Sequence, residues 1–179
     1  YDVYGNPIQP AGAIPQGMTA EKIIEDYVNA IGGAGKIATI KDLAMNSTMS
    51  AGGADIAMKI LQKDGKIAVN LTMNGMTMSN RVYDGTKAKE TGMGGARDLE
   101  GEELNDMKEQ ALFCKEATYK TGGYKLALKG MEPINGSNAY VLEVVRPDGK
   151  KTTEYYDTKS SLKVREITTA PGQDGQPTT

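Results

Sequence analysis

Residues 56–82 read IAMKILQKDGKIAVNLTMNGMTMSNRV, and apolar side chains fall at alternate positions along most of this stretch. Alternation with a period of two is typical of a β-strand that buries one face. Two dipeptides interrupt the pattern, Asp64-Gly65 and Asn74-Gly75, and both are typical of two-residue turns between antiparallel strands. The stretch therefore predicts three consecutive strands joined by two tight hairpins.

The two predicted turns agree on which residues share a face of the sheet. The first turn places Ile60 opposite Val69, Met58 opposite Leu71, and Ile56 opposite Met73. The second places Met73 opposite Met76, Leu71 opposite Met78, and Ile67 opposite Val82. A slip of one residue would move every side chain to the other face, so this agreement favours one register. The predicted apolar face comprises Ile56, Met58, Ile60, Ile67, Val69, Leu71, Met73, Met76, Met78 and Val82, and the opposite face carries Lys59, Lys63, Asn70, Thr72, Thr77, Ser79 and Arg81.

Helices are expected at two places. Thr19 is a good N-cap and Gly32-Gly33 supply a C-terminal stop for a first helix. A second, more polar helix is expected from Glu100 to Phe113, after a glycine-rich loop over 92–95. A strand through Leu43, Met45 and Met49 precedes the hairpins, and a weak strand through Ala88 and a meander over 124–167 follow them. The pattern predicts an α+β, mainly antiparallel fold of eight or nine strands.

The ends of the chain lack periodic apolar residues. Residues 1–17 contain three prolines and three glycines, which predicts a linker. Residues 170–179 consist mostly of Gly, Pro, Gln and Thr, which predicts a disordered tail. The patterned residues between them, 18–169, suit a single domain.

Composition excludes several function classes. The chain has no histidine, which removes the usual general base near neutral pH and the commonest metal ligand. Its single cysteine, Cys114, cannot form an internal disulfide or a thiolate metal cluster. A net charge of −2 gives no basic surface for nucleic acid, and no apolar run is long enough to span a bilayer. We expect no catalytic residue, no metal, no cofactor, no nucleic-acid partner and no transmembrane segment.

Paired carboxylates are the remaining enzymatic interpretation, because glycoside hydrolysis needs only two acids across the scissile bond. Glu102 and Glu103 are adjacent on the predicted second helix and therefore point about 100° apart. The chain also has no tryptophan to form a sugar-binding platform. A solvated helix face is the favoured interpretation of these two residues.

Methionine is the unusual residue of this chain. Of ten methionines, six fall on the predicted apolar face or on the strand beside it: Met45, Met49, Met58, Met73, Met76 and Met78. Methionine is flexible and polarizable, so it fills irregular gaps in a core and also adapts to ligands of variable shape. Two interpretations follow, a core packed by the first helix or the lining of an apolar cavity. The candidate ligand-binding residues are these six together with Leu71 and, from the first helix, Tyr27.

Several short motifs and their order carry a family resemblance. They are Ala30-Ile31-Gly32-Gly33, Gly123-Tyr124-Lys125-Leu126, Asn135-Gly136-Ser137-Asn138-Ala139-Tyr140, Pro147-Asp148-Gly149, and Tyr155-Tyr156-Asp157 followed by Leu162. Over residues 19–168 this order resembles the bacterial outer-membrane lipoprotein-sorting (LolA-like) superfamily. The resemblance implies a curved half-barrel whose concave face is covered by the N-terminal helix and the inserted helix. It also implies an apolar cavity that binds a lipid, acyl chain or lipoprotein, and a location in the periplasm or cell envelope.

The same resemblance implies an arginine that holds a lid in place. Arg81 and Arg97 are the arginines near the corresponding region, and the sequence does not choose between them.

A second resemblance covers residues 1–33. Tyr1-Asp2-Val3-Tyr4-Gly5-Asn6, a proline-rich spacer, and Gly17-Met18-Thr19-Ala20-Glu21 look like the junction before a C-terminal appendage of insulinase-like zinc peptidases. This resemblance implies an alternative function, a structural or substrate-docking domain without a ligand cavity. An upstream peptidase domain would then be a partner, and any peptidase activity would belong to it, because its zinc signature requires histidine.

Overall fold

A computed structural model describes residues 13–134 and 136–168. The linker predicted over 1–17 lies outside the described residues as far as residue 12, and the tail predicted over 170–179 lies wholly outside them. The chain divides into two compact units. The first unit extends to Ala34 and resumes at Glu116, and the second unit comprises Gly35–Lys115. In the part of the chain that is described, no helix has the length and apolar composition needed to cross a membrane.

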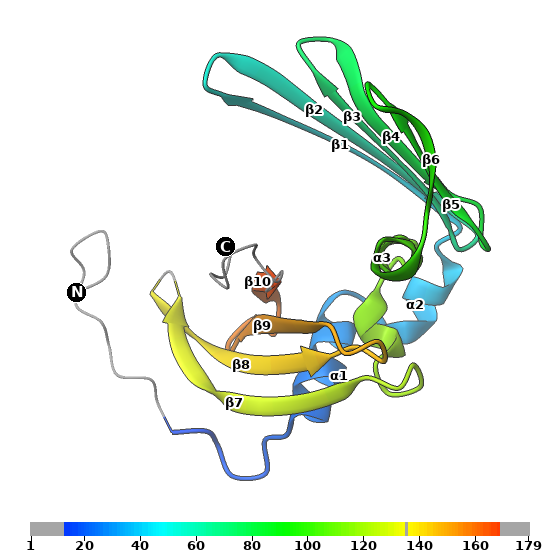
Figure 1. The fold of residues 1–179 in the computed structure, drawn as a ribbon. Coiled ribbons are helices and arrows are strands. Elements are labelled where there is room, and N and C mark those ends of the chain that lie inside the picture. Colours follow the sequence, from blue (N-terminus) through cyan, green and yellow to red (C-terminus); the bar gives the residue numbers. More distant parts are fainter. Residues whose placement is uncertain (1–12, 135, 169–179) are drawn as a thin grey trace. The chain divides into compact units, whose positions relative to one another are not determined.

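The second unit is an antiparallel sheet followed by a helix (Figure 1). Its six strands lie in sequence order, so each strand pairs with the one before it. They are β1 (Asp42–Ala51), β2 (Ala54–Lys63), β3 (Lys66–Met73), β4 (Met76–Tyr83), β5 (Ala88–Gly92) and β6 (Gly95–Leu99), and the helix is α3 (Gly101–Gln110). A short helix, α2 (Gly33–Thr39), spans the boundary between the two units in the sequence.

Both predicted hairpin turns are confirmed. Asp64 and Asn74 each have a φ of 49°, and Gly65 and Gly75 have φ angles of 71° and 79°. Two consecutive positive φ angles are those of the turn type that Asp-Gly and Asn-Gly favour, whose twist matches that of the strands. The β2–β3 register is also as predicted, with Ile60 opposite Val69, Met58 opposite Leu71 and Ile56 opposite Met73.

The predicted β3–β4 register holds next to the turn but is wrong from Leu71 onward. Met73 faces Met76, but Leu71 faces Ser79 instead of Met78, and Ile67 faces Tyr83 instead of Val82. The reason is a β-bulge at Met78, which places one extra residue in β4 and shifts all later pairs by one.

The bulge changes which residues share the face of Ile67. Tyr83 is 8% exposed and joins the core, whereas Val82 is 40% exposed on the other face. Ser79 and Arg81 lie at alternate positions with Tyr83, opposite Leu71 and Val69. They therefore lie on the apolar face and not on the predicted polar face.

Helix α3 covers part of this face. It packs on β3 and β4, and its Met107, with Ala111 just after it, is buried against Ile67, Tyr83, Ala88 and Leu99. The side-chain amide of Gln62 donates a hydrogen bond to the carbonyl of Gln110 at the end of the helix. The predicted second helix is therefore confirmed, although its last turn ends at Gln110 and not at Phe113.

The first unit combines an N-terminal helix with a second antiparallel sheet. Helix α1 (Ala20–Ala30) begins after Thr19, whose hydroxyl accepts a hydrogen bond from the Lys22 amide, so the predicted N-cap is confirmed. The sheet order is β10-β9-β8-β7. Its strands are β7 (Lys125–Ile134), β8 (Ser137–Val145), β9 (Lys151–Asp157) and β10 (Lys163–Thr168). Helix α1 buries Ile23, Ile24 and Val28 and contacts β7.

The α+β, mainly antiparallel fold class is confirmed. The described strands number ten, in sheets of six and four, where the sequence predicted eight or nine. The weak strand predicted through Ala88 is β5, and the strand that the sequence did not predict is β6, which is five residues long and contains few apolar side chains. We had predicted a loop over 92–95 where the structure has the turn of this hairpin.

Candidate functional site

The predicted ligand-binding residues fall in both units. Tyr27 lies on α1 in the first unit, where its ring meets the ring of Tyr156 edge-on, with centroids 5.3 Å apart. The other seven residues lie on β1 to β4 of the second unit: Met45, Met49, Met58, Leu71, Met73, Met76 and Met78. Their role as ligand contacts stays a prediction.

Strand pairing brings most of these seven residues onto one side of the sheet. Met49, Ile56, Met73 and Met76 form one row across four strands, because each faces the next. Met45 faces Ile60 two rows further along, on the same side. We call this surface the methionine face and define it as Met45, Met49, Ile56, Met58, Leu71, Met73 and Met76. Met78 is the extra residue of the bulge and lies opposite no residue of β3.

The methionine face is largely open to solvent. Met45, Met49 and Met76 are 46%, 60% and 62% exposed, and Met58, Leu71 and Met73 are half-buried. The core under α3 uses other residues, at the end of the sheet where β3 begins. A contiguous exposed apolar surface is unusual on a protein without a binding partner.

Two shallow hollows lie at the hairpin ends of the six-stranded sheet. One of about 360 Å³ lies at the β1–β2 hairpin and is lined by Thr48, Met49, Ser50, Asp55, Ile56 and Ala57. The other, of about 210 Å³, lies at the β5–β6 hairpin and is lined by Met78, Glu90, Gly92, Met93, Gly94, Gly95 and Arg97. Gly92 must be glycine there, because a Cβ would come within 2.3 Å of the Met78 carbonyl oxygen.

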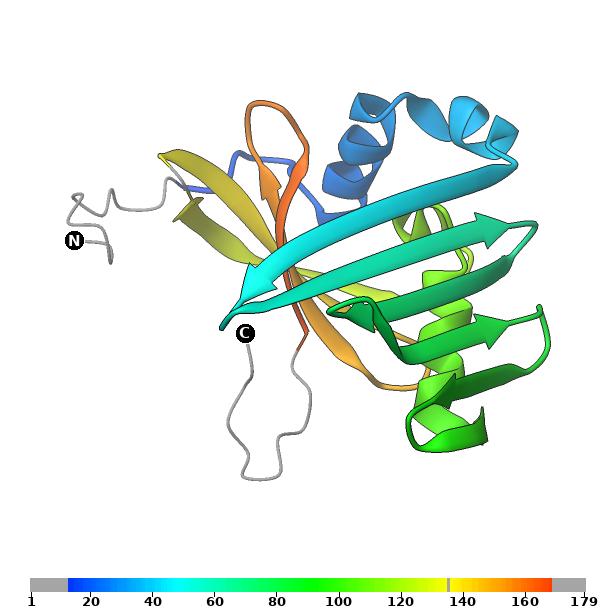
Figure 2. The same ribbon diagram turned by 90° about the horizontal axis from the view of Figure 1, so that it is seen from above.

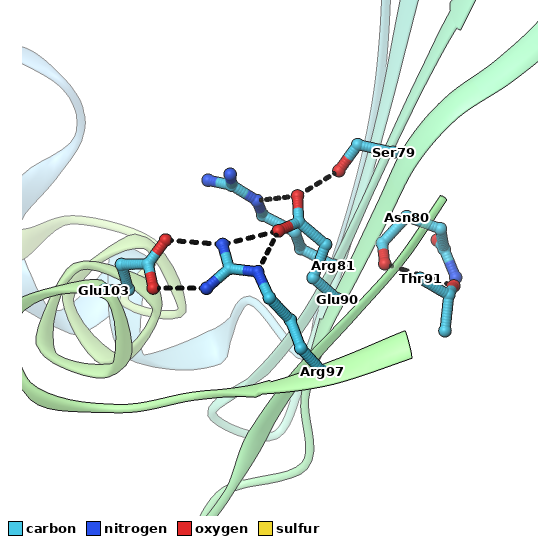
Figure 3. A network of polar contacts seen from close by, with 7 residues as sticks. All are labelled: Ser79, Asn80, Arg81, Glu90, Thr91, Arg97 and Glu103. Atoms are coloured by element: carbon cyan, nitrogen blue, oxygen red, sulfur yellow. Dashed lines mark hydrogen bonds and ion pairs between the residues drawn. The ribbon is translucent and has the colours of Figure 1, made fainter. Parts of the chain in front are cut away.

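A charged network lies on the same side of the sheet, beside the second hollow (Figure 3). Glu90 accepts hydrogen bonds from the Ser79 hydroxyl at 2.7 Å and from Arg81 Nε at 2.9 Å. Arg97 donates two more to Glu90, at 2.9 and 2.6 Å. The hydrogen bond from Ser79, followed by those from Arg81 and Arg97, lowers the pKa of Glu90 to about 2. Glu90 is therefore a fixed anion and not a proton donor at neutral pH.

Arg97 also connects the sheet to α3. Its guanidinium donates two hydrogen bonds to Glu103, both 2.7 Å long, in the bidentate geometry that suits a planar carboxylate. Of the two arginines that the family resemblance offered, Arg97 makes these hydrogen bonds to the inserted helix, and Arg81 binds Glu90. The pair is about half exposed, so solvent screens it and it contributes little to stability.

Sequence reasoning missed this network. Arg81, Glu90 and Arg97 lie directly opposite one another on β4, β5 and β6, so opposite charges alternate across three strands. The signal existed in the sequence, but it appears only after the bulge at Met78 and the short strand β6 are recognised.

A second charged cluster lies in the first unit, with Glu116 and Glu154 buried and Glu166 exposed. Glu154 is completely buried and accepts hydrogen bonds from the Tyr119 hydroxyl at 2.6 Å and the Tyr156 hydroxyl at 2.5 Å. Lys163 Nζ lies 3.8 Å from Glu154 and binds Glu116 at 2.5 Å and Glu166 at 2.6 Å. The carboxylates of Glu116, Glu154 and Glu166 approach within 4.8 Å of one another, a spacing that suits a metal ion. The Lys163 ammonium supplies positive charge at that position.

The pKa values in the buried cluster follow from burial and charge. Burial opposes the charged form of Lys163, but the carboxylates of Glu154 and Glu116 outweigh it and raise the pKa of the ammonium. Burial and then the charge of Glu154 raise the pKa values of Tyr119 and Tyr156. Lys163 therefore stays charged and both tyrosines stay neutral at physiological pH, which is typical of a structural cluster.

Comparisons with known proteins bear on the fold. No protein-family model matches the sequence, and no curated protein matches it. A DUF1329 family protein from Desulfovibrio piger has a similar fold, with a TM-score of 0.53 and 13% identity over 88% of this chain and 75% of that one. A LolA superfamily protein from Nitrosomonas europaea is also similar, with a TM-score of 0.47 and 14% identity over 89% of this chain and 74% of that one.

At such low identity these likenesses concern the fold alone. The likeness to the DUF1329 family protein supports the predicted α+β, mainly antiparallel fold, and the LolA-like resemblance itself is carried by the sequence motifs. The resemblance of residues 1–33 to a peptidase junction stays a prediction, and residues 1–12 of it lie outside the described residues.

Proposed function

We propose that this chain is a non-catalytic module of the bacterial cell envelope that binds the acyl chain of a lipid or lipoprotein on its methionine face. The observation that carries the proposal is that this face is exposed to solvent, whereas α3 covers the other end of the same side of the sheet. A soluble domain normally buries such a row of apolar side chains against its own helices. The exposure of this row on a regular sheet favours a function in which an apolar ligand covers it.

The chemistry of the face fits an acyl chain. Each methylene group that leaves water contributes about 0.8 kcal/mol, so a long chain needs only an apolar surface and no specific polar contact. Flexible thioether side chains adapt to chains of different length and branching. Leu71 and Met73 add half-buried apolar surface along the same strand.

Polar groups border the face where β4, β5 and β6 meet. Ser79 lies opposite Leu71, and its hydroxyl is held by Glu90. We therefore expect the acyl chain to lie along the methionine face and its polar end to point toward this border. In this proposal α3 acts as a cover, and Arg97 holds it through Glu103.

The non-enzymatic part of the proposal has its own support. The chain has no histidine, Glu90 is saturated by cationic and hydroxyl donors, and Glu154 is buried under two tyrosines. Neither carboxylate is available as a general acid or base. A periplasmic or envelope location is proposed with the LolA-like fold as its support.

A fluorescence titration with a long-chain fatty acid analogue tests the proposal. Met49→Asp places a charge at an exposed position of the face and is expected to weaken binding at least tenfold, since a charge opposes burial of the chain. Leu61→Asp is the matched control, because Leu61 is 44% exposed on β2, where it faces Ala68 and Ala44 on the opposite side of the same sheet.

Two results would contradict acyl-chain binding. One is absence of uptake by the wild-type chain, and the other is equal weakening by the Met49 and Leu61 substitutions. Capture of an insulinase-like peptidase domain by a chain that binds no fatty acid would instead support the docking alternative.

A further inference from the structure

The edges of the two sheets differ in how they are protected against pairing with another strand. An edge strand presents unpaired amide and carbonyl groups, and proteins usually protect it with charges, proline, bulges or short length. Three of the four edge strands have such protection among the described residues. Strand β6 is five residues long with Arg97 and Asp98, β7 carries Lys125, Lys129, Pro133 and a bulge, and β10 carries Lys163, Arg165, Glu166 and a bulge.

Strand β1 is the exception. It is ten residues long and pairs with β2 in an unbroken register from Asp42 to Ala51. Every residue from Asp42 to Ser50 is exposed, and Asp42 is the single charged residue of the strand. Figure 2 shows β1 in cyan along the outer side of the six-stranded sheet, and among the described residues it pairs with no strand but β2. Such a long and regular edge, with a charge only at its first residue, is suited to receive another strand.

We propose that β1 pairs with β1 of a second copy of this chain, antiparallel and centred on Ser47. In this register Met45 faces the partner's Met49, Asn46 faces the partner's Thr48, and Ser47 faces its own counterpart. Residues with even numbers then share one face and residues with odd numbers the other, so the methionine face continues across the junction.

The charge pattern and the symmetry of this register suit pairing with a second copy. In this register Asp42 lies opposite the partner's Gly52, which is beyond the end of β1. The two copies therefore bring no like charges together. A shift of two residues in either direction would separate Met45 from the partner's Met49. The pairing is isologous, because the same strand contributes from both copies about a two-fold axis. It joins two six-stranded sheets into one continuous antiparallel sheet, and the unpaired amide and carbonyl groups at the edge of β1 gain hydrogen-bond partners.

Disulfide cross-linking tests the register directly. In a Cys114→Ser background, Ser47→Cys places two thiols opposite each other on the two-fold axis, at the roughly 4.5–5.5 Å Cα spacing of antiparallel pairs, which a disulfide can bridge. Ser50→Cys is the matched control on the same exposed strand, and its two copies lie six residues apart along the pair. We expect oxidation to yield covalent dimers at least tenfold faster for Ser47→Cys than for Ser50→Cys.

Charge exchange tests the interface without cross-linking. Asn46→Lys combined with Thr48→Lys places lysines opposite lysines, and analytical ultracentrifugation is expected to show a monomer. Asn46→Lys combined with Thr48→Glu makes every new charge face an opposite one, and the dimer is expected to return. Both positions are exposed, and circular dichroism checks that each variant is folded.

Four results would overturn the proposal. The first three are a wild-type chain that stays monomeric at the highest concentration reached, a dimer that persists in the double-lysine variant, and equal cross-linking at both cysteine positions. The fourth is a monomer whose β1 instead takes up an extended foreign peptide. None of these measurements depends on fatty acid binding, so failure here is distinct from failure of the proposed function.

Discussion

In the four-stranded sheet, β8 and β9 bury Leu142, Glu154 and Tyr156 completely, whereas every described side chain from Asp42 to Ser50 on β1 of the six-stranded sheet is exposed. The first unit buries even two carboxylates, Glu116 and Glu154, whereas the second leaves methionine side chains exposed to solvent. A sheet that buries its residues this fully specifies one packed arrangement. A sheet with an open apolar face and an open edge retains surfaces that a ligand or another chain can cover. The difference indicates that burial in the first unit contributes more to stability, and it is consistent with the binding role proposed for the second unit.

The largest expected effect lies in the buried cluster of the first unit. Glu154→Leu removes the acceptor of two buried tyrosine hydroxyls and a neighbour of Lys163. Breaking a buried charged cluster in this way is expected to reduce the free energy of unfolding by about 3–5 kcal/mol. Urea denaturation measures the change.

Glu143→Leu is the control for this substitution. Glu143 is on the adjacent strand, and its ion pair with Lys129, at 3.6 Å, is partly exposed. Such a pair contributes about 0–1 kcal/mol, so a loss as large as that of Glu154→Leu would show that the burial of Glu154 is not the cause.

A pair of apolar truncations compares the two sheets directly. Leu142→Ala is expected to cost about 2–5 kcal/mol, because it leaves a cavity in a fully buried site. Met49→Ala removes a side chain that is 60% exposed and is expected to change stability by no more than about 0.5 kcal/mol. Thermal or urea unfolding of both variants gives the comparison, and equal losses would contradict the difference in packing between the two sheets.

The smallest expected effect is the acid response of the network around Glu90. Since the pKa of this carboxyl is lowered to about 2, its ionised form stabilises the folded chain above the ordinary value near 4.5, and this contribution is lost as the pH falls toward 2. Glu90→Gln cannot titrate, so its stability should fall less than that of the wild type between pH 5 and about pH 3. Urea midpoints at both pH values measure the effect, and parallel curves for the two proteins would disprove it.

Several features of this fold followed from short stretches of sequence. The hairpins at Asp64-Gly65 and Asn74-Gly75 and the start of α1 at Thr19 are where local chemistry predicted them. The β2–β3 register followed as well, because a two-residue turn fixes the pairing of the strands that it joins.

The failures of prediction have a common origin. The bulge at Met78 has no local turn residue to announce it, and it reverses the faces of Val82 and Tyr83. Tyr83 is buried because α3 packs on its face of the sheet and Ala88 lies beside it, which alternation along β4 cannot indicate. Of the candidate site, the sequence identified the shared side of Met49, Met58 and Met73, but not the charged network that borders it.

The sequence alone determined the turn positions, the first helix, the antiparallel fold class and the absence of histidine chemistry, since each depends on neighbouring residues or on composition. Tertiary structure decided the rest. The Tyr119 hydroxyl reaches Glu154 across 35 positions of the chain, and Gln62 reaches Gln110 across 48. Such pairs form because packing of apolar surface brings distant segments together, and buried polar groups then require partners wherever the fold supplies them. The exposure of the methionine face is likewise a property of what the rest of the fold leaves uncovered.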